Sequence, residues 1–236
     1  MEGILSLIKK YFAILFLSTL SLFCIFSQNN ASSELLRFPL WYVMAEDPML
    51  FDNTEAPKSE LNNAKNKLQE LAPFFIEGLV YGWNFSYTPY DKTRGVSEYF
   101  EITPIVAFPN EDYYYRFTDP NFQENTSKIE VWVEYDLTPT MILVRQRWFN
   151  AAYPTISGKG SASVFAGVKS IPVATELAAK SAIREYARTL VKNKPKEIKG
   201  QILLTDIPRY YIDAGNYVTD LDFFLKVSKI VEYTKF

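Results

Sequence analysis

Two stretches of the sequence alternate strictly between large apolar side chains and smaller or polar ones. Every odd position from 79 to 87 carries Leu, Tyr, Trp or Phe, and the odd positions from 129 to 137 carry Ile, Val, Tyr or Leu. A period of two places successive side chains on opposite faces of a β-strand. We therefore predict strands over 79–87 and 129–137, each with one face in the core.

Other segments favour strands without strict alternation. Residues 38–44 are rich in strand formers, and 99–108 form a candidate strand that one proline interrupts, which predicts a sheet edge or a bulge. The polar stretch 110–127 is predicted to be a long loop. Residues 141–149 follow a Thr-Pro-Thr turn and are predicted to pair back on 129–137 as a central β-hairpin.

A period near 3.6 predicts two main helices. The first covers 57–72, where Pro57 suits the first helical position and Pro73 is expected to end the helix. The second covers 172–192. Its predicted apolar stripe consists of Ala179, Ala182, Ile183, Tyr186, Leu190 and Val191.

The segment 156–168 is rich in Gly, Ser and Ala, and we predict a thin strand there. Gly158 and Gly160 flank a lysine, but no Gly-Lys-Ser/Thr pattern follows, so they do not form a phosphate-binding loop. They are interpreted as a turn or as a closely packed strand. A final hairpin is predicted from residues 201–212 and 217–231, joined by an Asp-Ala-Gly-Asn turn.

These elements predict an α+β fold with one or two antiparallel sheets and two main helices, in a single domain over residues 28–236. The order strand, helix, strand, strand occurs on each side of the central hairpin, and a Pro-x-x-Ile-x-Gly sequence follows each helix. This order is consistent with a duplicated βαββ unit, with pseudo-repeats at 37–108 and 156–231. Since Pro and Gly are common at any helix-to-strand junction, a chance similarity is the alternative.

The N-terminal 27 residues have the pattern of a secretory signal peptide. Lys9 and Lys10 precede the uncharged, mostly apolar run 11–26, and the sequence turns polar directly afterwards. We predict that residues 1–27 are a signal peptide cleaved after Ser27. Sixteen residues are fewer than the roughly 20 that span a bilayer, and retention as an N-terminal anchor is the alternative.

Composition narrows the chemistry that the protein can perform. The chain of 236 residues contains no His, and its one Cys, Cys24, lies within the predicted signal peptide. This excludes Ser-His-Asp and Cys-His catalysis and zinc sites that contain His. No cofactor, metal site or catalytic residue is predicted. A carboxylate-based hydrolase is the enzymatic alternative, with the candidate acids Glu98, Glu101, Asp220 and Asp222.

Charge is distributed unevenly along the chain. The net charge of −2 gives no nucleic-acid signature. Residues 28–156 carry 10 basic and 18 acidic residues, whereas 157–236 carry 13 basic and 8 acidic ones. In the basic half, four cations lie four positions apart on the second predicted helix: Lys180, Arg184, Arg188 and Lys192. Three interpretations are open: a solvated face that complements the helix dipole, a face covered by the acidic first half of the chain, or a surface for an anion or an acidic partner.

Aromatic residues make up 16% of the chain. Most aromatic side chains serve cores, but exposed ones bind sugars and peptides, and the candidates for such a surface are Tyr81, Trp83, Tyr87 and Trp132. Trp132 shares its predicted strand face with charged residues, so we expect it to be the most exposed of the four.

The sequence thus predicts an exported bacterial cell-envelope protein, periplasmic or in the outer envelope, with a non-enzymatic role in binding or assembly. An exported body without cysteine favours a bacterial envelope over a eukaryotic secretory route. The expected partner is an envelope protein or a glycan, not a nucleic acid. Membrane contact is expected only through an uncleaved N-terminal segment or through surface charge. A glycan- or peptidoglycan-binding module is the first alternative, and the hydrolase is the second.

Overall fold

The described part of the protein is a mixed α+β structure with two antiparallel sheets, as predicted. The computed structural model describes residues 34–43, 57–108, 115–123, 128–190 and 193–233. Residues Glu34–Phe236 form one compact unit. The predicted signal peptide, residues 1–27, lies outside the described residues. Within the described ranges, no helix is both long enough and apolar enough to cross a membrane.

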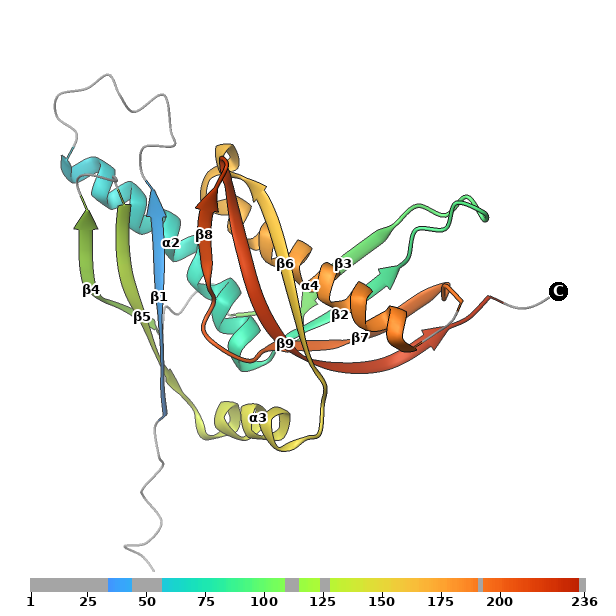
Figure 1. Cartoon of the computed structure of the whole chain (residues 1–236). Helices are drawn as coiled ribbons and strands as arrows, with labels where there is room; N and C mark the ends of the chain where they lie inside the picture. Colours follow the sequence, from blue (N-terminus) through green and yellow to red (C-terminus); the bar gives the residue numbers. More distant parts are fainter. Residues whose placement is uncertain (1–33, 44–56, 109–114, 124–127, 191–192, 234–236) are drawn as a thin grey trace, which may run out of the picture. The chain divides into compact units, whose positions relative to one another are not determined.

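The smaller sheet has three strands in the order β1-β5-β4 (Figure 1). They are β1 (Glu34–Val43), β4 (Tyr115–Gln123) and β5 (Lys128–Leu137). The alternation predicted for β5 is confirmed, since its odd residues are buried and its even residues are exposed or half-buried. A central hairpin is present, but its strands are β4 and β5.

The larger sheet has six strands in the order β3-β2-β7-β9-β6, and β8 also pairs with β9. They are β2 (Trp83–Thr88), β3 (Tyr99–Pro104), β6 (Thr155–Ser163), β7 (Glu197–Leu204), β8 (Tyr210–Asp213) and β9 (Asn216–Val231). The long β9 pairs with β7 and β8 along one edge and with β6 along the other. The predicted edge strand is confirmed: β3 lies at the sheet edge and ends at its proline.

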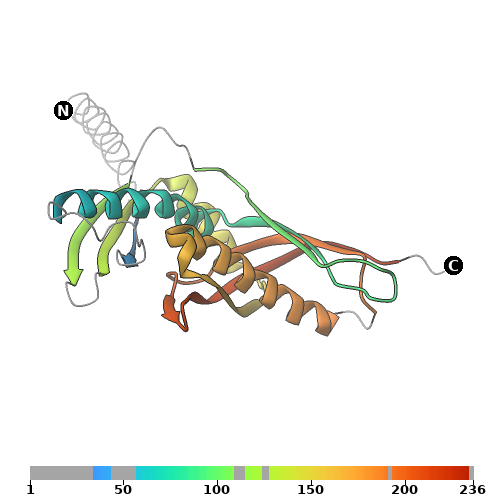
Figure 2. The same cartoon turned by 90° about the horizontal axis from the view of Figure 1, so that it is seen from above.

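Helices α2 and α4 cover these sheets (Figures 1 and 2). The helical segments are α2 (Pro57–Val80), α3 (Pro139–Asn150), the 3-10 turn η4 (Val164–Lys169) and α4 (Ser170–Leu190). Helix α2 packs against β1 and β5 of the smaller sheet and against β7 of the larger one. Helix α4 lies on β6 and β9. The two main helices predicted from the sequence are therefore α2 and α4, and α3 is additional.

The prediction that Pro73 ends the first helix is wrong, because α2 continues to Val80. A proline inside a helix lacks the N–H that would bond the carbonyl four residues earlier. Here that carbonyl belongs to Gln69, and it accepts a 3.0 Å hydrogen bond from the hydroxyl of Tyr115 in β4. The side chain of Tyr115 thus replaces the missing donor. Residues 79–80, predicted as the start of a strand, belong to the helix.

The predicted strand over 141–149 is also wrong, because this segment lies in α3. Thr138 caps the helix: its side-chain oxygen accepts a 3.3 Å hydrogen bond from the backbone N–H of Met141. Pro139 occupies the first turn, where its fixed φ favours a helix. These start signals outweigh the strand propensity of the residues that follow. The stretch 110–127, predicted as a loop, contains β4, which pairs with β5.

The strand-helix-strand-strand order occurs on both sides of the β4–β5 hairpin, but the first strands differ in their pairing. Strand β1 belongs to the smaller sheet, whereas β6 pairs with β9 in the larger sheet. The duplication of 37–108 and 156–231 stays a prediction.

Helix α4 lies directly on β6 because both surfaces carry small residues. A Cβ added at Gly160 would overlap the carbonyl oxygen of Ala174, and one added at Gly158 would overlap that of Ala178. The buried face of α4 includes Ala174, Ala178, Ala179, Ala182 and Ile183. The interpretation of the two glycines as a closely packed strand is therefore confirmed.

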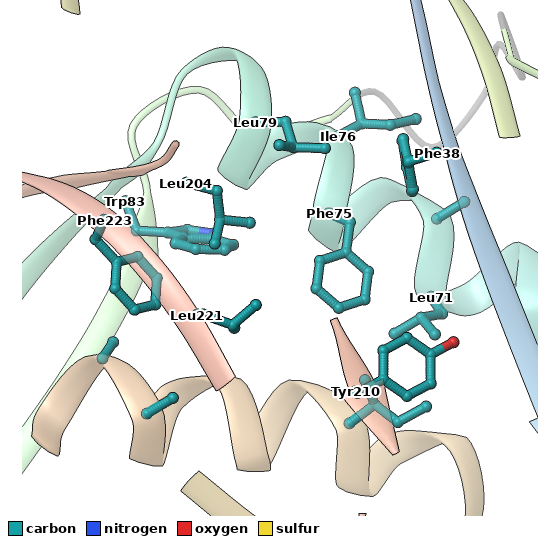
Figure 3. Close-up of a cluster of buried hydrophobic side chains, with 14 of the residues drawn as sticks. Phe38, Leu71, Phe75, Ile76, Leu79, Trp83, Leu204, Tyr210, Leu221 and Phe223 are labelled. Carbon is teal, nitrogen blue, oxygen red and sulfur yellow. The ribbon is translucent and has the colours of Figure 1, made fainter. Parts of the chain in front are cut away.

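The core extends from one sheet to the other through aromatic side chains (Figure 3). The ring of Phe75 in α2 lies parallel to that of Tyr210 in β8, with centroids 6.3 Å apart, and contacts Phe38 in β1 edge-to-face. The buried Tyr210 hydroxyl accepts a hydrogen bond from the backbone N–H of Trp41 and donates one to the carbonyl of the same residue, both at 2.8 Å. A side chain of the larger sheet thus satisfies the outer edge of β1.

We expect Tyr210→Phe to lower the free energy of unfolding by about 2 kcal/mol, because it leaves a half-buried backbone donor and acceptor of Trp41 without the hydroxyl that bonds both. For a domain of this size that corresponds to a fall of about 4–8 °C in Tm, measurable by thermal denaturation. Tyr211→Phe is the matched control, since Tyr211 is 42% exposed on the same strand. Equal stability of the Tyr210→Phe variant and the wild type would contradict this account of the β1 edge.

Candidate anion-binding cleft

A cleft of about 680 Å³ opens between the C-terminal half of α4 and the turn that joins β2 to β3. Helix α4 contributes Arg184 and Arg188 to its wall, and the segment after the helix contributes Lys194. Tyr87 and Glu98, which flank the β2–β3 turn, line the opposite wall. The cleft therefore brings together residues up to about a hundred positions apart in the sequence.

Three cations line this cleft, and helical spacing brings two of them together. Arg184 and Arg188 are four residues apart, so they lie one above the other on α4. Arg188 forms an ion pair with Glu185, with its Nη1 2.7 Å and 2.9 Å from the two carboxylate oxygens. The Nε of Arg184 lies 3.8 Å from the same carboxylate, and it is buried without a hydrogen-bond partner in the part of the chain that the structure describes. Lys194 donates a 2.9 Å hydrogen bond to the carbonyl of Tyr90.

Glu98 is the carboxylate of the cleft wall, and it is already paired. It accepts a 3.0 Å hydrogen bond from the hydroxyl of Tyr87, and its other oxygen lies 3.4 Å from Nζ of Lys180. Burial raises the pKa of Tyr87 well above its ordinary value; the Glu98 carboxylate raises it further, while Arg184 and Arg188 oppose both effects. Tyr87 is thus a neutral hydroxyl that donates to Glu98 at every physiological pH.

The β2–β3 turn is held by the carboxylate of Asp91. It accepts hydrogen bonds from the hydroxyl and backbone N–H of Thr93 and from Arg94, and these interactions lower its pKa to about 2. The backbone of Asp91 also pairs with Val96 in both directions at 2.9 Å. These hydrogen bonds fix the turn that follows Tyr90, which lines the cleft.

The structure gives different surroundings to the four cations of the predicted ladder. Arg184 and Arg188 line the cleft, and Lys180 lies beside it, paired with Glu98. Lys192 lies outside the described residues. Lys194, which follows the ladder in the sequence, lines the cleft, although it was not among the predicted site residues.

The structure does not gather the four aromatic candidates into one exposed surface. Trp83 is 1% exposed and stacks on Phe74 in the core, and Tyr81 packs against the same core. Trp132 lies in the other sheet, half-buried, with the guanidinium of Arg37 4.3 Å above its ring. The remaining member, Tyr87, is buried at the wall of the cleft. The exposed aromatic side chain of the cleft is Tyr90, which is 55% exposed and which the strand pattern did not single out.

Comparison with known proteins assigns the family. A protein-family model of uncharacterised function matches residues 21–233. The chain belongs to this family. It is similar to an uncharacterised protein of the bacterium Treponema pallidum (strain Nichols), with 29% identity over 207 residues that cover 87% of this chain and 85% of that protein. No solved structure shows a significant match.

Three of the four acids named as hydrolase candidates form separate hydrogen bonds in this family member. Asp222 accepts hydrogen bonds from Ser157 and Arg209, and Glu101 accepts one from Tyr99. Glu98 is bound to Tyr87, as described above. Within the ranges that the structure describes, no three acidic residues gather in a group that could hold a metal ion.

Proposed function

We propose that the protein is an exported component of the bacterial cell envelope that binds an anionic ligand or partner, without catalysis, through the cleft beside α4. The observation that carries the proposal is the charge of this cleft. Arg184, Arg188 and Lys194 line it together with one carboxylate, that of Glu98, and the carboxylate of Glu185 lies beside both arginines. Lys180 already offsets the carboxylate of Glu98, so the cleft keeps an excess of positive charge.

The surroundings of the cations favour an anion-binding surface over a solvated helix face. A solvated cation is satisfied by water, but Nε of Arg184 is buried and lacks a hydrogen-bond partner among the described residues. Buried donors without a partner are costly, and an anion in the cleft would provide one. The guanidinium group also matches a carboxylate or phosphate with two parallel hydrogen bonds.

Export is supported by the sequence alone. Lys9 and Lys10, the apolar run 11–26 and the polar exit match a signal peptide, and the similar protein belongs to a bacterium. The proposed location is the periplasm or the outer envelope, with cleavage after Ser27.

The test replaces both cleft arginines and follows what the protein binds. Native envelopes that contain the wild type or the Arg184→Gln/Arg188→Gln variant are crosslinked, and the species captured with the protein are identified. Each charge-assisted hydrogen bond contributes about 1.5–3 kcal/mol, so we expect capture of the specific ligand to fall at least about tenfold. The variant removes the arginine partners of Glu185. Because Glu185 is exposed, we expect the variant to fold.

The matched control is Lys169→Gln/Lys226→Gln, which removes the same charge from exposed positions away from the cleft. It should capture as much as the wild type. Undiminished capture by the arginine variant, with its circular dichroism unchanged, would refute the cleft as the binding site. The same material tests export: the recovered protein should fractionate with the envelope and have the intact mass of residues 28–236.

A further inference from the structure

We infer that the ligand of the cleft is a saccharide that carries a carboxylate, an inference that rests on the proposed anion-binding function and names its ligand class. Two members of the cationic ladder, Arg184 and Arg188, and one of the four aromatic candidates, Tyr87, meet at this one place. Arg184, Arg188, Tyr87 and Tyr90 all line it. The combination matters because a sugar acid presents both a charge and a ring.

The apolar part of the cleft suits the flat face of a sugar ring. Tyr90 is 55% exposed, and two other rigid rings, those of Pro89 and Pro195, also line the cleft. A pyranose has one face of C–H groups, and the ring of an amphipathic aromatic residue covers such a face at low entropic cost. The volume of about 680 Å³ is in the range of small-molecule sites and is large enough for a disaccharide.

The charged part favours a carboxylate over a phosphate. Phosphates bind at helix N-termini, where free N–H groups and the positive end of the dipole meet the anion. This cleft lies at the C-terminal half of α4, where the dipole is negative, so only side chains provide positive charge. Because the dipole at this end of α4 repels an anion, a group with one negative charge meets less repulsion than one with two. The guanidinium groups of Arg184 and Arg188, which line the cleft, are the donors we assign to it.

The remaining wall offers both hydrogen-bond donors and acceptors to the hydroxyl groups of a sugar. Glu98 accepts one hydrogen bond from Tyr87 and keeps further lone pairs for sugar hydroxyls. Asn193 offers both a donor and an acceptor from its amide. A few polar groups within a largely apolar lining give a site its specificity.

The experiment measures binding by titration calorimetry with the protein purified as it accumulates in cells. Four probes are compared: N-acetylglucosaminyl-N-acetylmuramic acid, a glucuronic acid–N-acetylglucosamine disaccharide, neutral chitobiose and inorganic phosphate. We expect at least one carboxylated disaccharide to bind about tenfold or more tightly than chitobiose or phosphate. The carboxylated probe that binds more tightly shows whether the natural ligand belongs to the cell wall or to an acidic polysaccharide.

Two variants separate the ring contribution from the charge contribution. Tyr90→Ala should weaken the carboxylated disaccharide about fivefold or more and leave phosphate unchanged, whereas Arg184→Gln should remove the preference over chitobiose. Tyr99→Ala, which removes an equally exposed tyrosine outside the cleft, should have no effect.

The outcomes distinguish this inference from the proposed function. Phosphate that binds as tightly as every disaccharide, with no effect of Tyr90→Ala, overturns the saccharide and leaves the anion site standing. Binding of chitobiose as tight as that of the carboxylated probes overturns the carboxylate. The absence of binding to all four probes overturns the inference, while the crosslinking result decides separately whether the cleft has an anionic partner.

Discussion

Gly160→Val is expected to remove roughly 3 kcal/mol or more from the free energy of unfolding. The inner face of β6 has no room for a side chain there, because a Cβ would overlap the carbonyl of Ala174 and the backbone N of Ala178. Both atoms belong to the backbone of α4, so no rotamer change relieves the overlap. Helix and strand must move apart, and over-packing of this kind costs about 1–3 kcal/mol or more.

A loss of this size is a large fraction of the roughly 5–15 kcal/mol that stabilise a typical domain. It corresponds to a fall of about 6–12 °C in Tm, followed by circular dichroism. Ser161→Val is the matched control, because Ser161 is the next residue on the same strand and is exposed. It should change stability by no more than about 0.5 kcal/mol. If Gly160→Val and Ser161→Val had the same Tm, the close packing of α4 on β6 would be disproved.

The strands that the sequence predicted well are those whose two faces meet different surroundings. In β5 and β2 every second residue is buried, so the hydrophobic pattern records the environment directly. The same argument explains the small-residue strand β6, where Gly158 and Gly160 record the nearness of a helix. Local pattern and tertiary environment agree in these elements.

The wrong predictions arise where one residue, or a residue distant in the sequence, determines the secondary structure. Pro73 ends a helix in most contexts, and only the hydroxyl of Tyr115, from a strand 42 positions further on, lets α2 continue. The segment after Thr138 has the propensity of a strand, and one cap with a proline in the first turn makes it a helix. The cap could have been predicted from the Thr-Pro pair, whereas the hydroxyl bond could not.

Only the part of the candidate site that lies on α4 could be predicted from the sequence. The spacing of Arg184 and Arg188 places both on one face of α4 whatever the tertiary structure. Their opposite wall depends on the antiparallel pairing of β2 with β7, which no local pattern encodes. Lys194 meets Tyr90 across 104 positions for the same reason. The alternation that predicted β2 also indicated that its large residues face the core.

Trp83→Ala is the second change with a large expected effect, and it decides between a core role and a binding role. The indole is 1% exposed and stacks on Phe74 with ring centroids 4.9 Å apart. It also lies so close to α2 that a Cβ at Gly78 would overlap its ring. Truncation of a buried tryptophan costs about 3–5 kcal/mol, so we expect Tm to fall by about 10 °C or more.

Trp132→Ala is the control, since this tryptophan is half-buried on the outer face of β5 and its main partner is the guanidinium of Arg37. It should cost about 1 kcal/mol, the contribution of an exposed cation–π pair. A platform for a sugar would show the opposite pattern: Trp83→Ala would weaken binding and leave Tm unchanged. That result would support Trp83 as part of a binding surface. The expected loss of stability instead leaves Tyr90 as the exposed aromatic side chain of the cleft.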